Sequence, residues 1–570
     1  MVVKLADNIY SPLGATTWEN YRAVMAGRCA LRQYALPDGS RYTASLFPEA
    51  ERRHDDSYTF FEQLCIVSAS DAIARAGIDP RAAEVQFILS TTKGNVGLLR
   101  TEQPDNSRVL LGTSARIITE YFGNPNPPLV VSNACISGLS AQIVAMRSIA
   151  TGLCRTAVVI GCDVQCDFII SGFQSLHALS EDACRPFDAQ RCGLNLGEAA
   201  ATIVYGSAAD VCGSRWMACR GAMCNDANHI SGPSRTGEGS YRCLQSLGLT
   251  PEEKARLAFV SVHGTSTLYN DEMESIALER AGLSDTPVFS LKGIYGHTMG
   301  AAGVLETILS MQAVEHGVVF GTRGFESMGV SGKVSISGEN RATDKPAFVK
   351  LLSGFGGCNA AMCFELTEGK DGCRQERSAT PPALPAALHS IKITPTAEEL
   401  VEHYRTQVGD YPKFFKMDPL SRLGFVASEM LLKQLGNQPI GQYGVLLFNR
   451  SASLADDLAY QATIEDAENR FPSPSLFVYT LPNIVTGEIA IRNHFLTETN
   501  FMVLDAPHVG VMAAQIAVAA EREPQIAGWC EVDGRGNMLA ALVAVPQHTS
   551  KETIEKEINK LINETVQWKN

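Results

Sequence analysis

Short uninterrupted apolar runs alternate with segments of helical spacing through the first half of the chain. The runs at residues 84–90, 129–131, 156–163 and 199–205 have the length and composition of buried strands. Residues 57–77 show helical spacing and end at a glycine, which is typical of a helix C-terminus. Strands that alternate with helices in this way predict an α/β fold built in layers.

A second series of strands and helices follows between residues 258 and 365. It contains the strand FVSVHG, the glycine-rich turn GIYGHTMGAAG, a helix at residues 304–314 and the closing strand pair VKLLSGFGGCNAAMCFE. The two series together predict one domain of residues 1–366, with halves of about 1–206 and 207–366.

The pattern is interrupted at residues 367–389 and then begins again. The interruption is polar and then proline-rich, with no helical or strand period, so it predicts a linker. Beyond it, residues 418–436 parallel residues 58–77, and residues 501–510 parallel residues 129–138 position for position. Residues 390–570 are therefore expected to duplicate the first half only.

Two further helices have clear signals in the sequence. Thr16 and Glu19 have the spacing of a capping box at the start of one helix. The other, at residues 551–566, is amphipathic. Its apolar face carries Ile554, Ile558, Leu561 and Ile562.

Composition excludes some partners and locations. The formal net charge is −13 and no run of Lys and Arg stands out, so we expect no nucleic-acid partner. The N-terminal stretch MVVKLADNIYSPLG lacks the apolar core of a signal peptide, and no uncharged apolar run is long enough to span a bilayer. A cytoplasmic location with reduced cysteines is the expectation. Neither Cys162 with Cys166 nor Cys219 with Cys224 has zinc-site spacing with a matching second pair, so no metal site is expected.

Cys135 lies where the apolar run at residues 129–131 turns into helical spacing, in the motif NACISG. Free backbone N–H groups and the positive end of the helix dipole favour thiolate over thiol at a helix start, so this position predicts a nucleophile at neutral pH. The small residues Ala134, Ser137 and Gly138 leave room for a substrate carbonyl. The alternative is a buried structural thiol, which is expected for most of the sixteen cysteines.

Two later motifs place histidines where an α/β sheet usually presents functional groups. His263 follows a strand in VHGTSTLYNDEME, and His297 lies in the glycine-rich turn of SLKGIYGHTMGAAG. A lone histidine in such a place is as often structural as catalytic. Two histidines that follow a helix-start cysteine indicate more, because a reactive thiol needs proton donors or acceptors near pH 7.

Five motifs now stand in order: NACISG, RPFD with GEAAA, HGTST with ND, SLKG with GHTMGAAG, and GFGGCNA. In this order they resemble the β-ketoacyl-acyl-carrier-protein synthases of the Cys-His-His type. The resemblance covers residues 1 to about 366. Within that family, NACISG together with YNDEMES is similar to the synthases of bacterial aryl polyene and flexirubin pigment pathways.

The resemblance implies a thiolase-type α/β fold stacked as α-β-α-β-α layers, and decarboxylative Claisen condensation. An acyl group would move from the phosphopantetheine of acyl carrier protein (ACP) to Cys135, malonyl-ACP would lose carbon dioxide, and the carbanion would attack the thioester, with no separate cofactor. His263 and His297 match the family histidines that stabilise the enolate oxygen and assist decarboxylation. Lys292 matches the family lysine that tunes this pocket, with Glu274 as its expected carboxylate partner.

The resemblance also assigns an oxyanion hole and a gate. The hole would use the backbone N–H groups of Cys135 and Phe355, and donors of this kind are each worth on the order of 3 kcal/mol in a dry pocket. Phe355, in the segment GFGG, matches the family's gating phenylalanine, and neighbours such as Gly356 would let the loop change conformation. The alternative for Phe355 is a packed core aromatic.

The sequence departs from the family pattern in two ways. Cys358 stands where the family commonly has threonine, and thiolases use a second cysteine, so a thiolase remains an alternative. Residues 390–570 resemble the thiol-free partner subunits called chain-length factors, here joined to the synthase. Pro507 stands in this region where Cys135 stands in the first copy.

Half of a layered fold leaves one face of its sheet uncovered, so the third region is expected to dock on the synthase. In the family, the strand ahead of the nucleophile pairs antiparallel with its counterpart across a dimer axis. This implies that residues 501–504 pair with residues 129–132 and that the chain is a pseudo-dimer in one polypeptide, with association of further chains left open. The alternative is an independent domain on a flexible tether.

The expected function is elongation of an ACP-bound chain by two carbons, in an aryl polyene or related polyketide or fatty acid pathway. The third region would shape the tunnel or the partner interface. One alternative is a malonyl-ACP decarboxylase that primes chains without extending them, against which the retention of Cys135 argues. The other is a non-catalytic scaffold that binds carrier proteins.

Overall fold

The structure is a computed structural model of the chain. It describes residues 1–35, 39–52, 57–103, 106–208, 215–367, 388–436, 442–466 and 469–563. Most of the predicted linker, residues 368–387, lies outside the described residues.

One strand arrangement occurs three times in the described residues. The first copy has the order β1-β8-β6-β4-β5, the second β9-β16-β15-β10-β11 and the third β17-β21-β20-β18-β19. In each copy the last three strands are parallel and the first two run antiparallel to their neighbours. The chain is therefore built from three related half-folds, the third of which is the predicted duplicate of the first.

The strands of these copies have the following bounds. The first copy contains β1 (Val2–Tyr10), β4 (Val85–Ser90), β5 (Leu129–Val131), β6 (Thr156–Asp163) and β8 (Ala199–Ser207). The second contains β9 (Arg215–Asn225), β10 (Leu257–Ser261), β11 (Pro287–Phe289), β15 (Ala347–Ser353) and β16 (Cys358–Thr367). The third contains β17 (His389–Ile393), β18 (Gly444–Asn449), β19 (Thr499–Val503), β20 (Gln525–Val532) and β21 (Met538–Val545).

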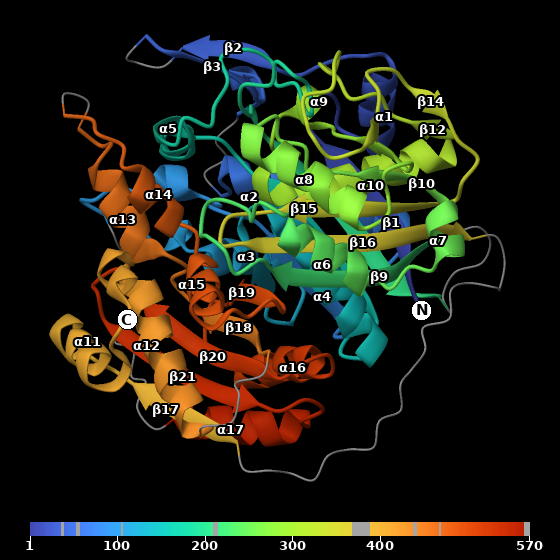
Figure 1. Cartoon of the computed structure of the whole chain (residues 1–570). Coiled ribbons are helices and arrows are strands. Elements are labelled where there is room, and N and C mark those ends of the chain that lie inside the picture. Colours follow the sequence, from blue (N-terminus) through green and yellow to red (C-terminus); the bar gives the residue numbers. More distant parts are fainter. Residues whose placement is uncertain are drawn as a thin grey trace.

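Two helices pack between the first two copies. They are α4 (Ser137–Thr151) and α10 (Ala302–Glu315), which cross at glycines. A Cβ on Gly303 would lie 2.4 Å from the backbone nitrogen of Leu139, so only glycine permits this approach. Outer helices such as α2 (Phe60–Ala76) and α8 (Leu268–Arg280) cover the other sheet faces, and Figure 1 shows the resulting layers. The expected layered α/β fold is confirmed.

Predicted helix ends also occur where expected. Thr16 and Glu19 form a reciprocal capping box at the start of α1 (Thr17–Met25), which satisfies backbone N–H groups that have no partner within the helix. Helix α2 ends at Gly77, whose φ of 64° places it in the left-handed region that favours glycine.

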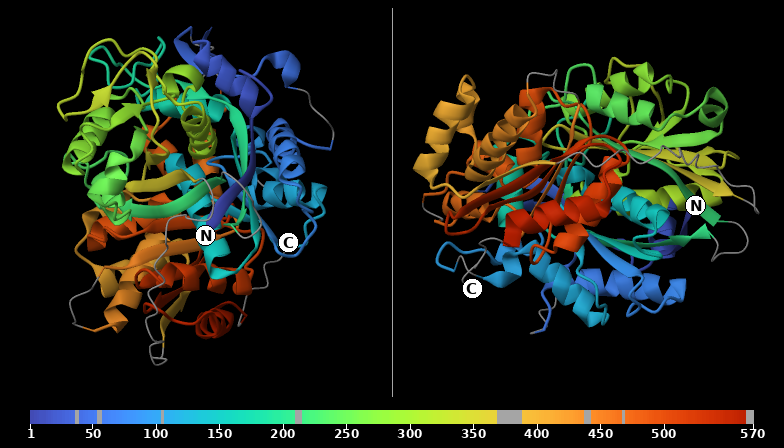
Figure 2. Two further views of the ribbon diagram at one scale, coloured as in Figure 1. Left: turned by 90° about the vertical axis from the view of Figure 1, so that its right-hand side faces the viewer. Right: turned by 90° about the horizontal axis from the view of Figure 1, so that it is seen from below.

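The third copy joins the first through the edge of β5. Strand β19 pairs antiparallel with β5, with Met502 opposite Val131 and Val503 opposite Val130. The predicted pairing of these segments is confirmed. It makes the described strands of the first and third copies continuous in a 16-stranded sheet, and Figure 2 shows the third copy (orange to red) packed along the side of the other two.

The exposed face expected on the third copy is covered by a helix of its own. Helix α16 (Val509–Ala520) takes the place of α4, and no described helix of the third copy is a counterpart of α10. Instead α17 (Lys551–Asn563) packs against α16 at the lower edge of the molecule in Figure 1. Its apolar residues share one buried cluster with Met512 and Ile516. They are Ile554, Ile558, Leu561 and Ile562.

One stretch, Ala134–Thr151, is long and apolar enough to cross a membrane, but 83% of it is buried inside the structure. It includes the central helix α4, and core helices of water-soluble proteins commonly have this length and composition.

Loss of apolar contact beneath α17 should destabilise the third copy. Ile558 is 1% exposed, so Ile558→Ala should lower the free energy of unfolding by about 3 kcal/mol in urea denaturation. Lys560→Ala is the matched control on the same helix, because its side chain is 65% exposed. Equal stability of the two variants would contradict the covering role of α17.

Candidate active site

Cys135 lies in a single 3-10 turn, Ala134–Ile136, between β5 and α4, as the sequence predicted. Ala134 has a φ of 46°, an uncommon value for a residue other than glycine. The hydroxyl of Ser137 stabilises this turn, since it accepts from the N–H of Asn133 at 2.8 Å and donates to the carbonyl of Ala134 at 2.6 Å. The turn thus holds the thiol at the start of α4.

His263 follows β10, and its backbone is held by hydrogen bonds to Glu274. The carboxylate of Glu274, on α8, accepts from the backbone N–H groups of His263 at 2.6 Å and Gly264 at 2.8 Å. Because the carboxylate accepts from backbone N–H groups, it fixes the position of His263 and leaves the ring nitrogens available for other contacts.

His297 lies between α9 (Lys292–Tyr295) and a 3-10 turn, Met299–Ala301. Its Nδ1 lies 3.3 Å from the backbone nitrogen of Met299, which donates to it. Nδ1 is then an acceptor, so the ring proton of the neutral imidazole is on Nε2.

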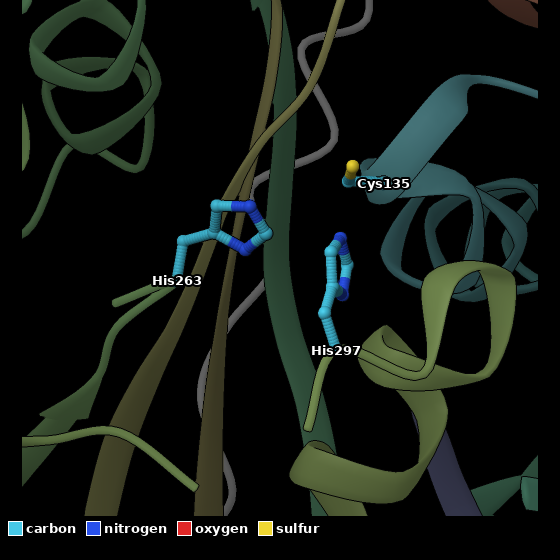
Figure 3. A group of neighbouring side chains, drawn as sticks. All are labelled: Cys135, His263 and His297. Atoms are coloured by element: carbon cyan, nitrogen blue, oxygen red, sulfur yellow. The ribbon is translucent and has the colours of Figure 1, made fainter. Parts of the chain in front are cut away.

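The thiol and the two imidazoles meet at one point. One ligand-type atom from each of Cys135, His263 and His297 lies within 4.8 Å of the others, and the two rings are perpendicular at a centroid distance of 5.1 Å. Figure 3 shows the three side chains, which come from separate elements, pointing into a shared space. Nδ1 of His263 and Nε2 of His297 are buried without a hydrogen-bond partner among the described residues. Each ring therefore keeps one nitrogen that is available for a further hydrogen bond.

The prediction that Glu274 is the carboxylate partner of Lys292 was wrong. Nζ of Lys292 lies 2.5 Å from a carboxylate oxygen of Glu306, on α10, and Nζ of Lys350, on β15, lies 2.8 Å from the other oxygen. Glu274 binds backbone N–H groups instead, for the reason given above. In the sequence, Glu306 and Lys350 each stand within an otherwise apolar helix or strand. A charge in such a place indicates a buried residue with a charged partner, and this pattern could have identified both.

Burial and these two lysines set the protonation of the site. Burial lowers the pKa of His263 and His297 well below the usual value, and the charges of Lys292 and Lys350 lower it further. Both imidazoles are therefore neutral at pH 7. Burial also raises the pKa of Cys135 to about 12, against the opposing effect of Lys292. The expectation of a preformed thiolate was wrong, because burial of the charged form outweighs the helix start.

A thiol and two imidazoles are also possible zinc ligands, and among the described residues these three form the one such group. The positive charges of Lys292 and Lys350 that lower both histidine pKa values also oppose a metal cation at this point. The electrostatics of the site therefore favour a developing negative charge over a bound cation.

The loop between β15 and β16 brings a second backbone donor close to Cys135. A Cβ on Gly354 would lie 3.2 Å from the backbone nitrogen of Cys135, so the two segments are adjacent. No backbone acceptor for the N–H of Phe355 is found among the described residues, so this group is available as a donor. The N–H of Gly356 is not free, because it donates to the carbonyl of Ile230 at 2.6 Å. Gly356 therefore contributes its φ of 89° to the loop and no oxyanion donor.

Two cavities meet at Cys135 and Phe355. The larger, about 1400 Å³ including open solvent, reaches the surface and contains both histidines. The smaller is about 320 Å³ by the same measure, of which only about 10 Å³ has room for a water-sized sphere; it is lined mostly by apolar side chains and includes Phe477 and Leu481 of the third copy. Phe355 and Phe173 line both cavities, with ring centroids 6.5 Å apart. Phe355 thus lies between the open cavity and the apolar one.

Cys358 is a buried thiol on the loop side of the site. Its sulfur lies 3.2 Å from the carbonyl of Phe355, and burial raises its pKa well above the usual value. It does not belong to the group of atoms that Cys135 forms with the two histidines.

The sequence matches two models of one protein family. Residues 9–210 match the β-ketoacyl synthase N-terminal domain, and residues 217–326 match the β-ketoacyl synthase C-terminal domain. The chain is 29% identical over 427 residues to a 3-oxoacyl-[acyl-carrier-protein] synthase 2 of Rhizobium meliloti, covering 65% of this chain and 99% of that protein. It is 26% identical over 416 residues to a polyketide β-ketoacyl synthase of Streptomyces halstedii, described there as putative, covering 63% and 97%.

Solved structures share the fold. A structure described as the PfaC keto synthase–chain length factor aligns with a TM-score of 0.74 at 14% identity, covering 96% of this chain and 78% of that one. A ketosynthase in complex with its chain length factor from Xenorhabdus doucetiae aligns with a TM-score of 0.55 at 23% identity, covering 64% and 98%. The first of these similarities extends over the third copy as well as the first two.

The raised pKa of Cys135 predicts how its reactivity depends on pH. Since the thiol stays protonated through neutral pH, its alkylation by iodoacetamide should rise about 100-fold between pH 7 and pH 9 without a plateau. Site-resolved mass spectrometry measures this, with the exposed Cys192 in the same samples as a monitor of the reagent. A rate for Cys135 that is already constant below pH 7 would show a preformed thiolate and contradict the account.

Proposed function

The chain belongs to the β-ketoacyl synthase family of condensing acyltransferases, and on that premise we propose that Cys135, His263 and His297 carry out its decarboxylative condensation. The observation that carries the proposal is the convergence of one thiol with two neutral imidazoles that have unpaired buried nitrogens. Acyl and malonyl groups carried on the phosphopantetheine of ACP are the proposed substrates.

Acyl transfer comes first. The sulfur of Cys135 attacks the carbonyl carbon of the incoming thioester, and its proton leaves by way of a neighbouring imidazole to the departing carrier thiol. The negative oxygen of the tetrahedral intermediate is held by the backbone N–H groups of Cys135 and Phe355, which lie on adjacent segments. The products are an acyl group on Cys135 and a free carrier thiol.

Decarboxylation and condensation follow at the histidines. As the bond to the malonyl carboxylate breaks, carbon dioxide leaves and the electron pair forms an enolate. Its oxygen accepts a hydrogen bond from Nε2–H of His297, with His263 beside it, in the positive field of Lys292 and Lys350. The enolate carbon attacks the acyl carbonyl, the carbon–sulfur bond breaks, and Cys135 leaves as a thiolate that takes up a proton from water to restore the thiol.

Glu306 gives this site its balance of charge. It pairs with both lysines and is itself nearly inaccessible, so two buried ammonium groups share one carboxylate. Burial and the charges of the two lysines together keep both imidazoles neutral, so that Nε2–H of His297 acts on the enolate oxygen as a hydrogen-bond donor. We assign Lys292 and Glu306 to this role, and Glu274 to the placement of His263.

The third copy is proposed to act as a chain-length-factor-like partner in the same polypeptide. It has proline where the first copy has its nucleophile, so it lacks the thiol chemistry. It instead supplies Phe477 and Leu481 to the apolar cavity beside Cys135. Two of the similar structures are a ketosynthase together with a chain length factor, which supports this assignment.

A buried ion pair lies at the wall of the apolar cavity. Nζ of Lys93, which lines this cavity, lies 2.5 Å from a carboxylate oxygen of Asp457 in the third copy. The same ammonium group donates to the carbonyl of Thr480, so its charge is satisfied within the protein. An apolar acyl chain cannot replace the ion pair and hydrogen bond of this buried ammonium group, so displacing them would cost free energy. The pair is therefore expected to limit the length of the acyl chain.

The motifs NACISG and YNDEMES support an aryl polyene or related polyketide pathway as the setting. In such a pathway the β-keto product would pass to a reductase and a dehydratase before returning for another round.

Intact-protein mass spectrometry with acyl-ACP and malonyl-ACP tests the proposed function. The wild type should form an acyl adduct and release a β-ketoacyl product two carbons longer. Cys135→Ala should form no adduct, and its condensation rate should fall by a factor on the order of 10³ or more. Cys154→Ala, at a thiol that lines neither cavity, is the matched control and should behave like the wild type.

Other outcomes identify the rival functions. Loss of carbon dioxide without an extended product in the wild type would indicate a priming decarboxylase. Carrier-protein binding with no adduct and no turnover would indicate a scaffold. Either result would overturn the proposal.

A further inference from the structure

The loop that carries Phe355 makes contacts on both of its sides that hold it in place. On one side, the N–H of Gly356 donates to the carbonyl of Ile230 and the amide of Asn225 donates to the carbonyl of Gly356, both within the first two copies. On the other side, the loop rests on the third copy. The flanking glycines Gly354 and Gly356 supply the backbone freedom that movement of Phe355 requires.

Asn483 makes the contact from the third copy. It lies directly ahead of α15 (Ile484–Asn493), and its Nδ2 donates to the carbonyl of Phe355 at 2.8 Å. The same nitrogen lies 3.7 Å from the sulfur of Cys358, which itself donates to that carbonyl at 3.2 Å. Asn483 thus connects Phe355, which lies between the two cavities, to the third copy. The third copy has no thiol at the position that matches Cys135.

The fit between the loop and α15 leaves no spare room. A Cβ on Gly487 would lie 2.5 Å from the carbonyl oxygen of Gly356, and a Cβ on Gly356 would lie 2.6 Å from Nδ2 of Asn483. Oδ1 of Asn483 is buried and has no hydrogen-bond partner among the described residues. Its side chain is therefore placed by the contacts of Nδ2 with the carbonyl of Phe355 and the sulfur of Cys358.

We infer that Asn483 is a positioning residue through which the third copy holds Phe355 across the entrance to the apolar cavity. The hydrogen bond from Asn483 fixes the peptide between Phe355 and Gly356, and that peptide must turn when the ring moves aside. Acyl groups long enough to enter the apolar cavity need this movement, whereas an acetyl group fits on Cys135 without it. The third copy thereby affects which acyl groups load, in addition to lining the cavity that receives them.

The test compares long and short acyl groups on the same thiol. Asn483→Leu removes the donor and keeps a side chain of similar size. Loss of one neutral hydrogen bond should favour the open loop about fivefold. The ratio of the initial acylation rates of Cys135 by hexanoyl-pantetheine and acetyl-pantetheine should therefore rise about fivefold over the wild type, measured as intact mass.

Matched variants separate this role from a structural one. Asn493→Leu, at the far end of α15, removes contacts with Glu429 and Ile489 and not with the loop, so the ratio should not change. Asn483→Ala, which removes the donor and leaves empty the space that leucine fills, should shift the ratio in the same direction as Asn483→Leu. A residue needed only for folding would lower both rates together and leave the ratio as it was.

The inference rests on the proposed function, and the results distinguish the two. If the wild type forms no adduct with either thioester, the proposed function fails and the inference fails with it. If the wild type is acylated at Cys135 and both Asn483 variants keep its ratio, the role of Asn483 alone is overturned.

Discussion

The antiparallel contact between β5 and β19 is the constraint on which the rest of the structure depends. Strand β5 is three residues long, and without β19 one edge of the strand that leads to Cys135 would have unpaired backbone groups in the interior. The contact extends past the strand, because the amide of Asn133 donates to the side chain of Asn500 at 2.7 Å and accepts from the backbone of Phe501 at 2.8 Å. The third copy is therefore part of the sheet that positions the nucleophile.

Burial then determines the chemistry of the groups that this sheet brings together. It keeps the thiol of Cys135 protonated and both imidazoles neutral, so protons move during the reaction rather than before it. The cluster of Lys292, Glu306 and Lys350 adds a positive field without placing a charge in the reacting space. A site of this kind stabilises negative charge that appears only in the transition state and the enolate.

The sequence predicted the features that follow from local pattern. Cys135, His263 and His297 lie at strand ends and helix starts, where periodicity changes, and the β5–β19 pairing was predicted from the internal duplication together with what the family resemblance implies about strand pairing. It did not predict the partner of Lys292, because Glu306 lies on a helix from another part of the chain and only the fold brings the two charges within 2.5 Å. The same holds for Asn483, whose contact with Phe355 joins residues 128 positions apart. The protonation state of Cys135 depends on how deeply its thiol is buried, and the spacing of residues in the sequence does not predict that depth.

A crystal structure with a hexanoyl group on Cys135 tests most directly whether the third copy completes the acyl site. The account predicts that the chain passes Phe355, contacts Phe477 and Leu481, and ends before the ion pair of Lys93 and Asp457. An acyl chain that lies in the open cavity, or that contacts only residues of the first two copies, would contradict it.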